Sequence, residues 1–276
     1  MMGNTGIEGE VQHHYTHGSL ADGIDTSLLA LGKDPTSISA DDLALIDEFH
    51  IGGRPASLAL FGQCGFKAGM HLLDVGSGLG GPARTCANAC GVHVTGVDLT
   101  AEYVEVANQL SSRVGLASVT SFQQGSVLDL PFAEALFDGA YMIHVGMNIA
   151  HKLRLFQEVR RVLRPGAVFG IYDVMQLADG ALQFPLPWSS IRATSFAEPP
   201  QTYRDGLAEA GFEITAEHNK LAAALDFFAE NIRRESAGNL PVLAHRGPGW
   251  GVKSQNLQAM LKAGRVGPVE IVARAI

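Results

Sequence analysis

Two stretches of the chain place residues where they could bind a nucleoside. Asp74 stands near the end of an apolar run, and Gly76, Gly78 and Gly81 follow it at short intervals. Glycines at such a turn let a ligand approach the main chain closely, and a helix that begins there presents free N–H groups to it. Asp98 ends the next apolar run, where it could accept hydrogen bonds from both hydroxyls of a ribose. These residues predict a cofactor that contains a nucleoside.

The elements that must position these residues alternate between strand and helix. The apolar pattern predicts strands near 71–75, 93–98, 119–123, 138–143 and 167–172, and helices near 81–90, 100–113 and 151–163. Later elements are a strand at 213–216, helices at 221–235 and 252–264, and a closing strand at 269–275. This alternation is typical of an α/β fold, in which helices cover both faces of a mostly parallel sheet.

The chain divides into three regions on composition. Residues 1–17 are expected to form a flexible N-terminal segment, and residues 18–65 a helical cap in which Ser39 starts one of the helices. The main α/β domain is expected over 66–276, with an irregular lid insertion at about 176–197.

Composition limits the classes of partner. The chain has 276 residues, 17% of them charged, and a formal net charge of −8, which is ordinary for a globular protein. Since no run of Lys and Arg occurs, nucleic acid is not expected as a partner, and no apolar run reaches the roughly 18 residues of a membrane span. Three cysteines and no recognisable targeting peptide favour a reducing cytoplasm. No metal is expected, because His13 and His17 lack a third ligand.

The glycine spacing leaves two kinds of cofactor open. Gly76-x-Gly78-x-x-Gly81 also fits a dinucleotide-binding turn, which would indicate a nicotinamide-dependent oxidoreductase. Asp74, two residues before the first glycine, could instead reach a cationic amine. A short polar side chain at Ser126, with a nearby backbone N–H, could hold an adenine. The long helical segment before the turn also favours this second kind of cofactor, one that carries both a cationic amine and an adenine.

Four short motifs carry a family resemblance. They are Leu73-Asp74-Val75-Gly76-Ser77-Gly78-Leu79-Gly80, Gly96-Val97-Asp98-Leu99, Leu130-Pro131-Phe132 with Phe137-Asp138, and Val162-Leu163-Arg164-Pro165-Gly166. With these motifs the chain resembles the class I S-adenosylmethionine-dependent methyltransferases. Its N-terminal helical region resembles the small-molecule branch, which includes sarcosine/dimethylglycine and phosphoethanolamine N-methyltransferases. The resemblance implies a Rossmann-like, mostly parallel seven-stranded sheet with helices on both faces.

The resemblance also implies the cofactor, S-adenosylmethionine, and the residues that would bind it. Asp74 would face the methionyl amine, Asp98 would hold the ribose hydroxyls, and Ser126 would accept from the adenine amino group. The complete set is Asp74, Gly76, Ser77, Gly78, Gly80, Asp98, Leu99, Ser126, Val127 and His144.

Methyl transfer from a sulfonium is an in-line displacement that needs alignment, exclusion of water and, for an acceptor that must lose a proton, a base. His144, after the fourth strand, is the candidate base. Amine-methylating relatives carry an acidic residue where this chain has His144 and a histidine where it has Asn148. Tyr15 is the second catalytic candidate, because in relatives an N-terminal tyrosine folds over the site. Asn148, Phe184 and Trp188 are the candidate substrate contacts.

The combined interpretation is methyl transfer to a small-molecule acceptor, which leaves S-adenosylhomocysteine as the product. An amine nitrogen is the expected acceptor. The alternatives are O- or C-methylation of a phenol, quinone or other natural-product scaffold, and a protein that binds S-adenosylmethionine without methyl transfer. No membrane partner is expected, and the protein is expected to be a monomer or a homodimer.

Overall fold

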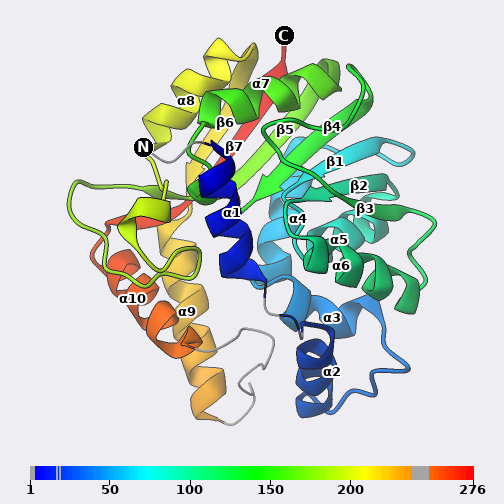
Figure 1. Ribbon diagram of the computed structural model, residues 1–276, viewed down its shortest axis with the longest axis vertical. Helices are drawn as coiled ribbons and strands as arrows, with labels where there is room; N and C mark the ends of the chain where they lie inside the picture. Colours follow the sequence, from blue (N-terminus) through cyan, green and yellow to red (C-terminus); the bar gives the residue numbers. More distant parts are fainter. Residues whose placement is uncertain (1–3, 17, 19, 238–248) are drawn as a thin grey trace.

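A single seven-stranded sheet forms the centre of the protein (Figure 1). The computed structural model describes residues 4–16, 18, 20–237 and 249–276. The strand order is β3-β2-β1-β4-β5-β7-β6, with parallel pairing from β3 to β5 and antiparallel pairing of β7 with β5 and β6. The strands are β1 His71–Val75, β2 His93–Asp98, β3 Thr120–Gln124, β4 Phe137–Ile143, β5 Leu163–Gln176, β6 Phe212–Asn219 and β7 Val266–Ala275. This topology confirms the predicted Rossmann-like, mostly parallel sheet.

Helices cover both faces of this sheet, and successive β4 residues point to opposite layers. Tyr141 and Ile143 join the buried cluster that contains residues of α4 and α5, whereas Ala140 and Met142 join the cluster that contains residues of α7 and α8. The helices are α4 Gly53–Cys64, α5 Gly81–Cys90, α6 Ala101–Arg113, α7 Lys152–Val162 and α8 Pro200–Glu209. Where the apolar periodicity predicted one of these helices, the helix lies close to the predicted range.

Two helix boundaries show why the sequence pattern located these elements well. Helix α5 lies between Gly80 and Gly91, which have φ angles of 76° and 66°. These left-handed conformations are readily adopted by glycine, so the helix is bounded on both sides by residue type alone. Strand β5 begins at Leu163, before the predicted start at 167, because Leu163 pairs with Phe137 of β4.

The N-terminal region differs from the flexible segment predicted for residues 1–17. Asn4–Tyr15 form helix α1. Its contacts come from distant parts of the chain: Gln12 Nε2 donates to the carbonyl of Leu99 at 3.5 Å, and the His14 ring lies 3.1 Å from the carbonyl oxygen of Pro187. A short polar segment has little helical preference by itself, so these tertiary contacts account for the difference.

The region predicted to form a helical cap contains helices α2 Leu20–Ala30, α3 Ala40–Asp47 and α4. Ser39 caps α3 as expected, through a reciprocal capping box with Asp42. Helix α3 ends at Asp47, so that Glu48 to Ile51 form a loop on the cavity wall.

The C-terminal region adds helices α9 Leu221–Ser236 and α10 Trp250–Lys262. In Figure 1, α9 and α10 lie on one side of α1, and α2 and α3 lie on the other. Between β5 and α8, the region in which the lid insertion is predicted, the chain is irregular apart from the short 3-10 helix η2 Arg192–Thr194. None of the described helices has both the length and the apolar character needed to cross a membrane.

Candidate active site

A cavity of about 600 Å³ lies at the carboxyl ends of β1, β2 and β4, which is the usual binding edge of an open α/β sheet. Helix α1, the α3–α4 loop, the irregular segment and helices α9 and α10 complete its walls. Twelve of the fourteen predicted site residues line it: Tyr15, Asp74, Gly76, Ser77, Gly78, Asp98, Leu99, Ser126, Val127, His144, Asn148 and Trp188. The tertiary structure therefore brings together residues that are far apart in the sequence.

The remaining two predicted residues, Gly80 and Phe184, do not line the cavity. A side chain at Gly80 would collide with the Phe122 ring, so this glycine serves the packing of the turn against the sheet. Phe184 packs against the buried cluster that includes Leu257 and Leu261 of α10.

The glycine turn between β1 and α5 is held close to the loop that follows β4. A Cβ atom at Gly76 would lie 2.5 Å from Cγ2 of Val145, and its φ angle of 76° is one that other residues rarely adopt. Gly78 has a φ angle of 50°, and its N–H donates to Oδ2 of Asp98 at 2.8 Å. The turn therefore exposes backbone in the cavity and also orients the acidic residue of β2.

The Asp98 carboxylate is fixed from both sides. Gly78 N–H binds Oδ2, and Thr100 N–H donates to Oδ1 at 2.9 Å. Burial raises the pKa of this carboxyl, and the backbone donors oppose that shift. The carboxylate lines the cavity, where it can accept from a ligand.

Two buried polar groups beside the turn lack partners among the described residues. Oδ2 of Asp74 and Oγ of Ser77 make no hydrogen bond there, although the two residues are only 2% and 5% exposed. Burial raises the pKa of Asp74 to about 8, a shift that the nearby Tyr141 hydroxyl partly offsets. Unpaired buried polar atoms are costly in a folded protein, so these two atoms on the cavity wall are open to a hydrogen bond from a polar ligand group.

Helix α1 closes the cavity over the segment after β3. The Ser126 hydroxyl donates to the carboxylate of Glu8 and accepts from the N–H of Leu128 at 3.1 Å. Val127 follows on the same wall. The sequence did not identify Glu8, because nothing in a short polar helix indicates which distant residue it will contact.

His144 occupies a strained position directly after β4. Its φ angle of 55° places a non-glycine residue in the left-handed region, which is uncommon and concentrates at functional sites. The ring stacks on Tyr172 of β5 with centroids 5.4 Å apart, and Nε2 is buried without a described partner. Burial holds the pKa of His144 well below its usual value, so the ring is neutral at pH 7 and carries one unprotonated nitrogen.

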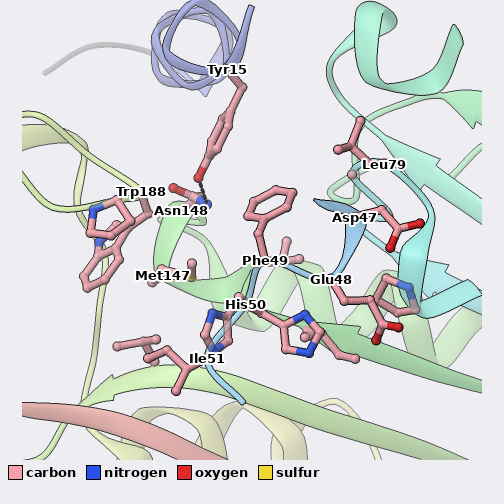
Figure 2. Close-up of a pocket in the computed structure, with 18 of the residues that line it drawn as sticks. Tyr15, Asp47, Glu48, Phe49, His50, Ile51, Leu79, Met147, Asn148 and Trp188 are labelled. Atoms are coloured by element: carbon pink, nitrogen blue, oxygen red, sulfur yellow. Dashed lines mark hydrogen bonds between the residues drawn. The ribbon is translucent and has the colours of Figure 1, made fainter. Parts of the chain in front are cut away.

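Tyr15 reaches the same site from α1. The Asn148 amide donates to the Tyr15 hydroxyl at 3.1 Å, the contact drawn as a dashed line in Figure 2. Figure 2 also shows that Tyr15 and His50 approach the cavity from opposite sides. The contact joins the predicted catalytic and substrate residues, and it ties α1 to the loop that carries His144.

A buried lysine that sequence reasoning missed supports this loop. Lys152 Nζ donates to the carbonyls of Gly146, Ile149 and Phe196 at 2.8–2.9 Å. Gly146 itself packs so closely against Asp173 and Tyr203 that no side chain fits there. A lysine in the first turn of an amphipathic helix gives no sequence signal of burial, because it is normally exposed.

A buried ion pair, which sequence reasoning also missed, supports the glycine turn. Arg84 of α5 pairs with Asp47 at 2.8 Å, and their side chains are 1% and 2% exposed. Arg84 also donates to the carbonyl of Leu79, to Ala107 O at 3.1 Å and to Ser111 Oγ at 3.0 Å. The ion pair thus links helix α3 of the helical cap to the glycine turn before α5.

The family model described as a methyltransferase domain matches residues 73–171. This stretch runs from within β1 to within β5 and contains the glycine turn, Asp98, Ser126 and His144. It is a methyltransferase domain, which confirms the resemblance drawn from the motifs.

Individual proteins extend this comparison. A sterol 24-C-methyltransferase of Gibberella zeae is 38% identical over 109 residues, which are 40% of this chain and 29% of that protein. An O-methyltransferase of Aspergillus sclerotiorum is 40% identical over 108 residues, which are 39% of this chain and 41% of that protein. The chain thus matches less than half of the length of these curated relatives.

A solved structure shares the fold over the whole chain. It is the geranyl diphosphate C-methyltransferase of Streptomyces coelicolor A3(2), in complex with Mg²⁺, geranyl diphosphate and S-adenosyl-L-homocysteine. The TM-score is 0.70 at 18% identity, and the superposition covers 100% of both chains. At this identity the likeness concerns the fold, including the N-terminal and C-terminal helices that lie outside the matched domain.

Proposed function

We propose that the protein transfers a methyl group from S-adenosylmethionine to a small organic molecule. The observation that carries the proposal is the pair of unpartnered buried groups, Asp74 Oδ2 and Ser77 Oγ, on the same wall as the pre-oriented Asp98 carboxylate. An ammonium group and a ribose diol are the ligands that this combination suits. The bound cofactor supplies an electrophilic methyl group on a sulfonium.

The chain's own residues then have distinct proposed roles. Asp74 and Ser77 hold the amino-acid end of the cofactor, and Asp98 holds the ribose hydroxyls. Leu99 packs on the adenine. Ser126 and the backbone of Val127 form the polar wall at this end, with α1 above them excluding water.

The acceptor is proposed to enter the other half of the cavity. The residues that line it there include the apolar and aromatic side chains of Phe49, Met147, Trp188, Phe227 and Trp250, next to polar residues of α9 and α10 such as Glu230 and Lys253. Flat aromatic faces and a thioether suit a planar or hydrocarbon body.

We infer a hydroxyl or carbon acceptor in preference to the amine nitrogen predicted from the sequence. Asp47 and Glu48 are the two wall carboxylates beside His50 in the chain, and each is paired with an arginine, Arg84 and Arg54 respectively. Oδ1 of Asp47 makes no hydrogen bond among the described residues, but the two ion pairs reduce the negative charge that this wall offers to an ammonium group. The matched relatives, a sterol C-methyltransferase and an O-methyltransferase, also support a carbon or hydroxyl acceptor.

Calorimetric titration with S-adenosylmethionine, and in parallel with S-adenosylhomocysteine, tests the proposal. Micromolar binding of both compounds is expected. No binding of either, with NADH binding in their place, would favour the oxidoreductase alternative and reject the proposal.

A further inference from the structure

His50, in the loop between α3 and α4, is held in one tautomer. Its Nε2 lies 3.0 Å from the carbonyl oxygen of Gly53 and 3.2 Å from Oγ of Ser57. A carbonyl can only accept a hydrogen bond. The Ser57 hydroxyl donates its own hydrogen to Oε2 of Glu48 at 2.6 Å, so towards His50 it accepts as well. Nε2 therefore carries the hydrogen.

The loop geometry that creates this contact is built into the sequence. Gly52 and Gly53 have φ angles of 85° and 52°, so the chain can turn back and aim the Gly53 carbonyl at the ring. A Cβ atom at Gly52 would lie 2.8 Å from the Cβ atom of Ala56, which leaves no room for another residue type. The two glycines thus fix the orientation of His50.

The consequence is an available lone pair in the cavity. In a neutral imidazole with a hydrogen on Nε2, Nδ1 is unprotonated. No described residue hydrogen-bonds Nδ1 of His50, and the residue lines the cavity. The rings of His144 and Tyr172 pack against it, with centroid distances of 5.8 and 6.3 Å.

The ring is also kept neutral. Burial lowers the pKa of His50, and the neighbouring Glu48 carboxylate only partly opposes the shift. Glu48 is committed elsewhere, since it accepts from Arg54 at 3.0 Å and from Thr85 and Ser57 at 2.6 Å. The other ionisable groups packed against the ring are His144, whose pKa is lowered by burial, and Tyr172, whose pKa is raised by burial. All of these conditions leave a neutral base at pH 7.

We propose that Nδ1 of His50 accepts the proton of an aromatic hydroxyl group bound in the apolar half of the cavity. This inference rests on the proposed methyl transfer and names its acceptor class. The O–H bond breaks heterolytically, its electron pair stays on the oxygen, and the proton forms an N–H bond on Nδ1 to give an imidazolium. Water takes this proton when the site opens. The oxygen left behind is a stronger nucleophile than the hydroxyl.

The tautomer is tested without any acceptor, by ¹⁵N NMR of the histidine side chains in the whole protein. The His50 signals are assigned by their loss in His50→Gln. The expected result at pH 7 is a neutral ring with hydrogen on Nε2 and none on Nδ1. A His50 ring with hydrogen on Nδ1, or one that is charged at pH 7, would overturn the proposal.

Turnover tests the role itself, with 2-naphthol and catechol as the hydroxyl probes and benzylamine as the amine probe. His50→Gln keeps a donor for Gly53 and Ser57 but removes the base nitrogen. We expect methylation of a hydroxyl probe by the wild type, with kcat about 100-fold lower in His50→Gln. We also expect a changed pH profile, KM within threefold and S-adenosylhomocysteine affinity within twofold.

The matched control is His151→Gln, the same change at an exposed position outside the cavity lining, and it should retain wild-type turnover. Equal kcat in His50→Gln and wild type would reject the proposal. So would methylation of benzylamine alone, or of no probe, by a wild type that binds S-adenosylmethionine. Absence of S-adenosylmethionine binding would instead reject the proposed function.

Discussion

Replacement of Asp98 by alanine is expected to weaken S-adenosylhomocysteine binding by about 1.5–3 kcal/mol, the usual range for hydrogen bonds to a charged group. This corresponds to a roughly 10- to 150-fold higher Kd. The upper part of the range is expected, because two backbone donors at 2.8 and 2.9 Å already fix the carboxylate. Little side-chain entropy is therefore lost when the ligand binds.

Calorimetry on three variants separates the loss of hydrogen bonds to the ribose from the effects of side-chain size and of net charge. Asp98→Asn keeps the size of the side chain and one carbonyl acceptor, so a smaller loss is expected. Asp129→Ala removes the same charge from a side chain that is 91% exposed, and it should leave the Kd within twofold. An unchanged Kd in Asp98→Ala, or an equal loss in Asp129→Ala, would refute the assignment of Asp98 to the ribose.

Three further predictions concern other parts of the site. The pKa of Asp74 is raised to about 8 in the empty site, so binding of a cation there should release a proton. Affinity should then rise with pH towards about 8 and level off above it, as measured by calorimetry in buffers of different ionisation enthalpy. Arg84→Met should lower the free energy of unfolding by about 3–5 kcal/mol in urea, because it leaves Asp47 buried without its partner. Tyr15→Phe should increase hydrogen exchange in α1 about 2- to 12-fold, because one hydrogen bond to Asn148, worth about 0.5–1.5 kcal/mol, is lost.

Each of these has a control. Asp74→Asn should remove the pH dependence of binding, and a dependence that survives in this variant would assign the proton to another group. The double variant Arg84→Met with Asp47→Leu should recover part of the lost stability, and a further loss in the double variant would contradict the pairing argument. Exchange in α1 that is unchanged by Tyr15→Phe would show that the Asn148 contact does not hold the helix.

The raised pKa of Asp74 also affects the stability of the protein without cofactor. Because the folded pKa lies above the ordinary value of 3.8, the folded state holds its proton more strongly than the unfolded chain. The contribution of Asp74 to stability is complete below about pH 4 and is lost as the pH rises towards about 8. A cofactor ammonium would offset this loss, so the site is more stable when it is filled.

How far the sequence predicts the site depends on the residue. Gly76, Gly78 and Asp98 were predictable because a glycine turn between a strand and a helix has few alternatives, and an acid at the end of the next strand lies beside it. Lys152 was not predictable, because its burial depends on three carbonyls brought together by separate loops. Gly80 was assigned to the cofactor on its motif, whereas its contact with Phe122 across the sheet gives it a packing role.

The sequence by itself determined the alternation of strands and helices, the glycine turn and the cofactor-binding edge, because these follow from local periodicity and backbone preference. Only the tertiary structure decided that the N-terminal segment is a helix over the cavity, and that its Tyr15 meets Asn148. Only the tertiary structure placed His50 against His144 and fixed its tautomer. These features depend on contacts between residues far apart in the chain, which no local pattern records.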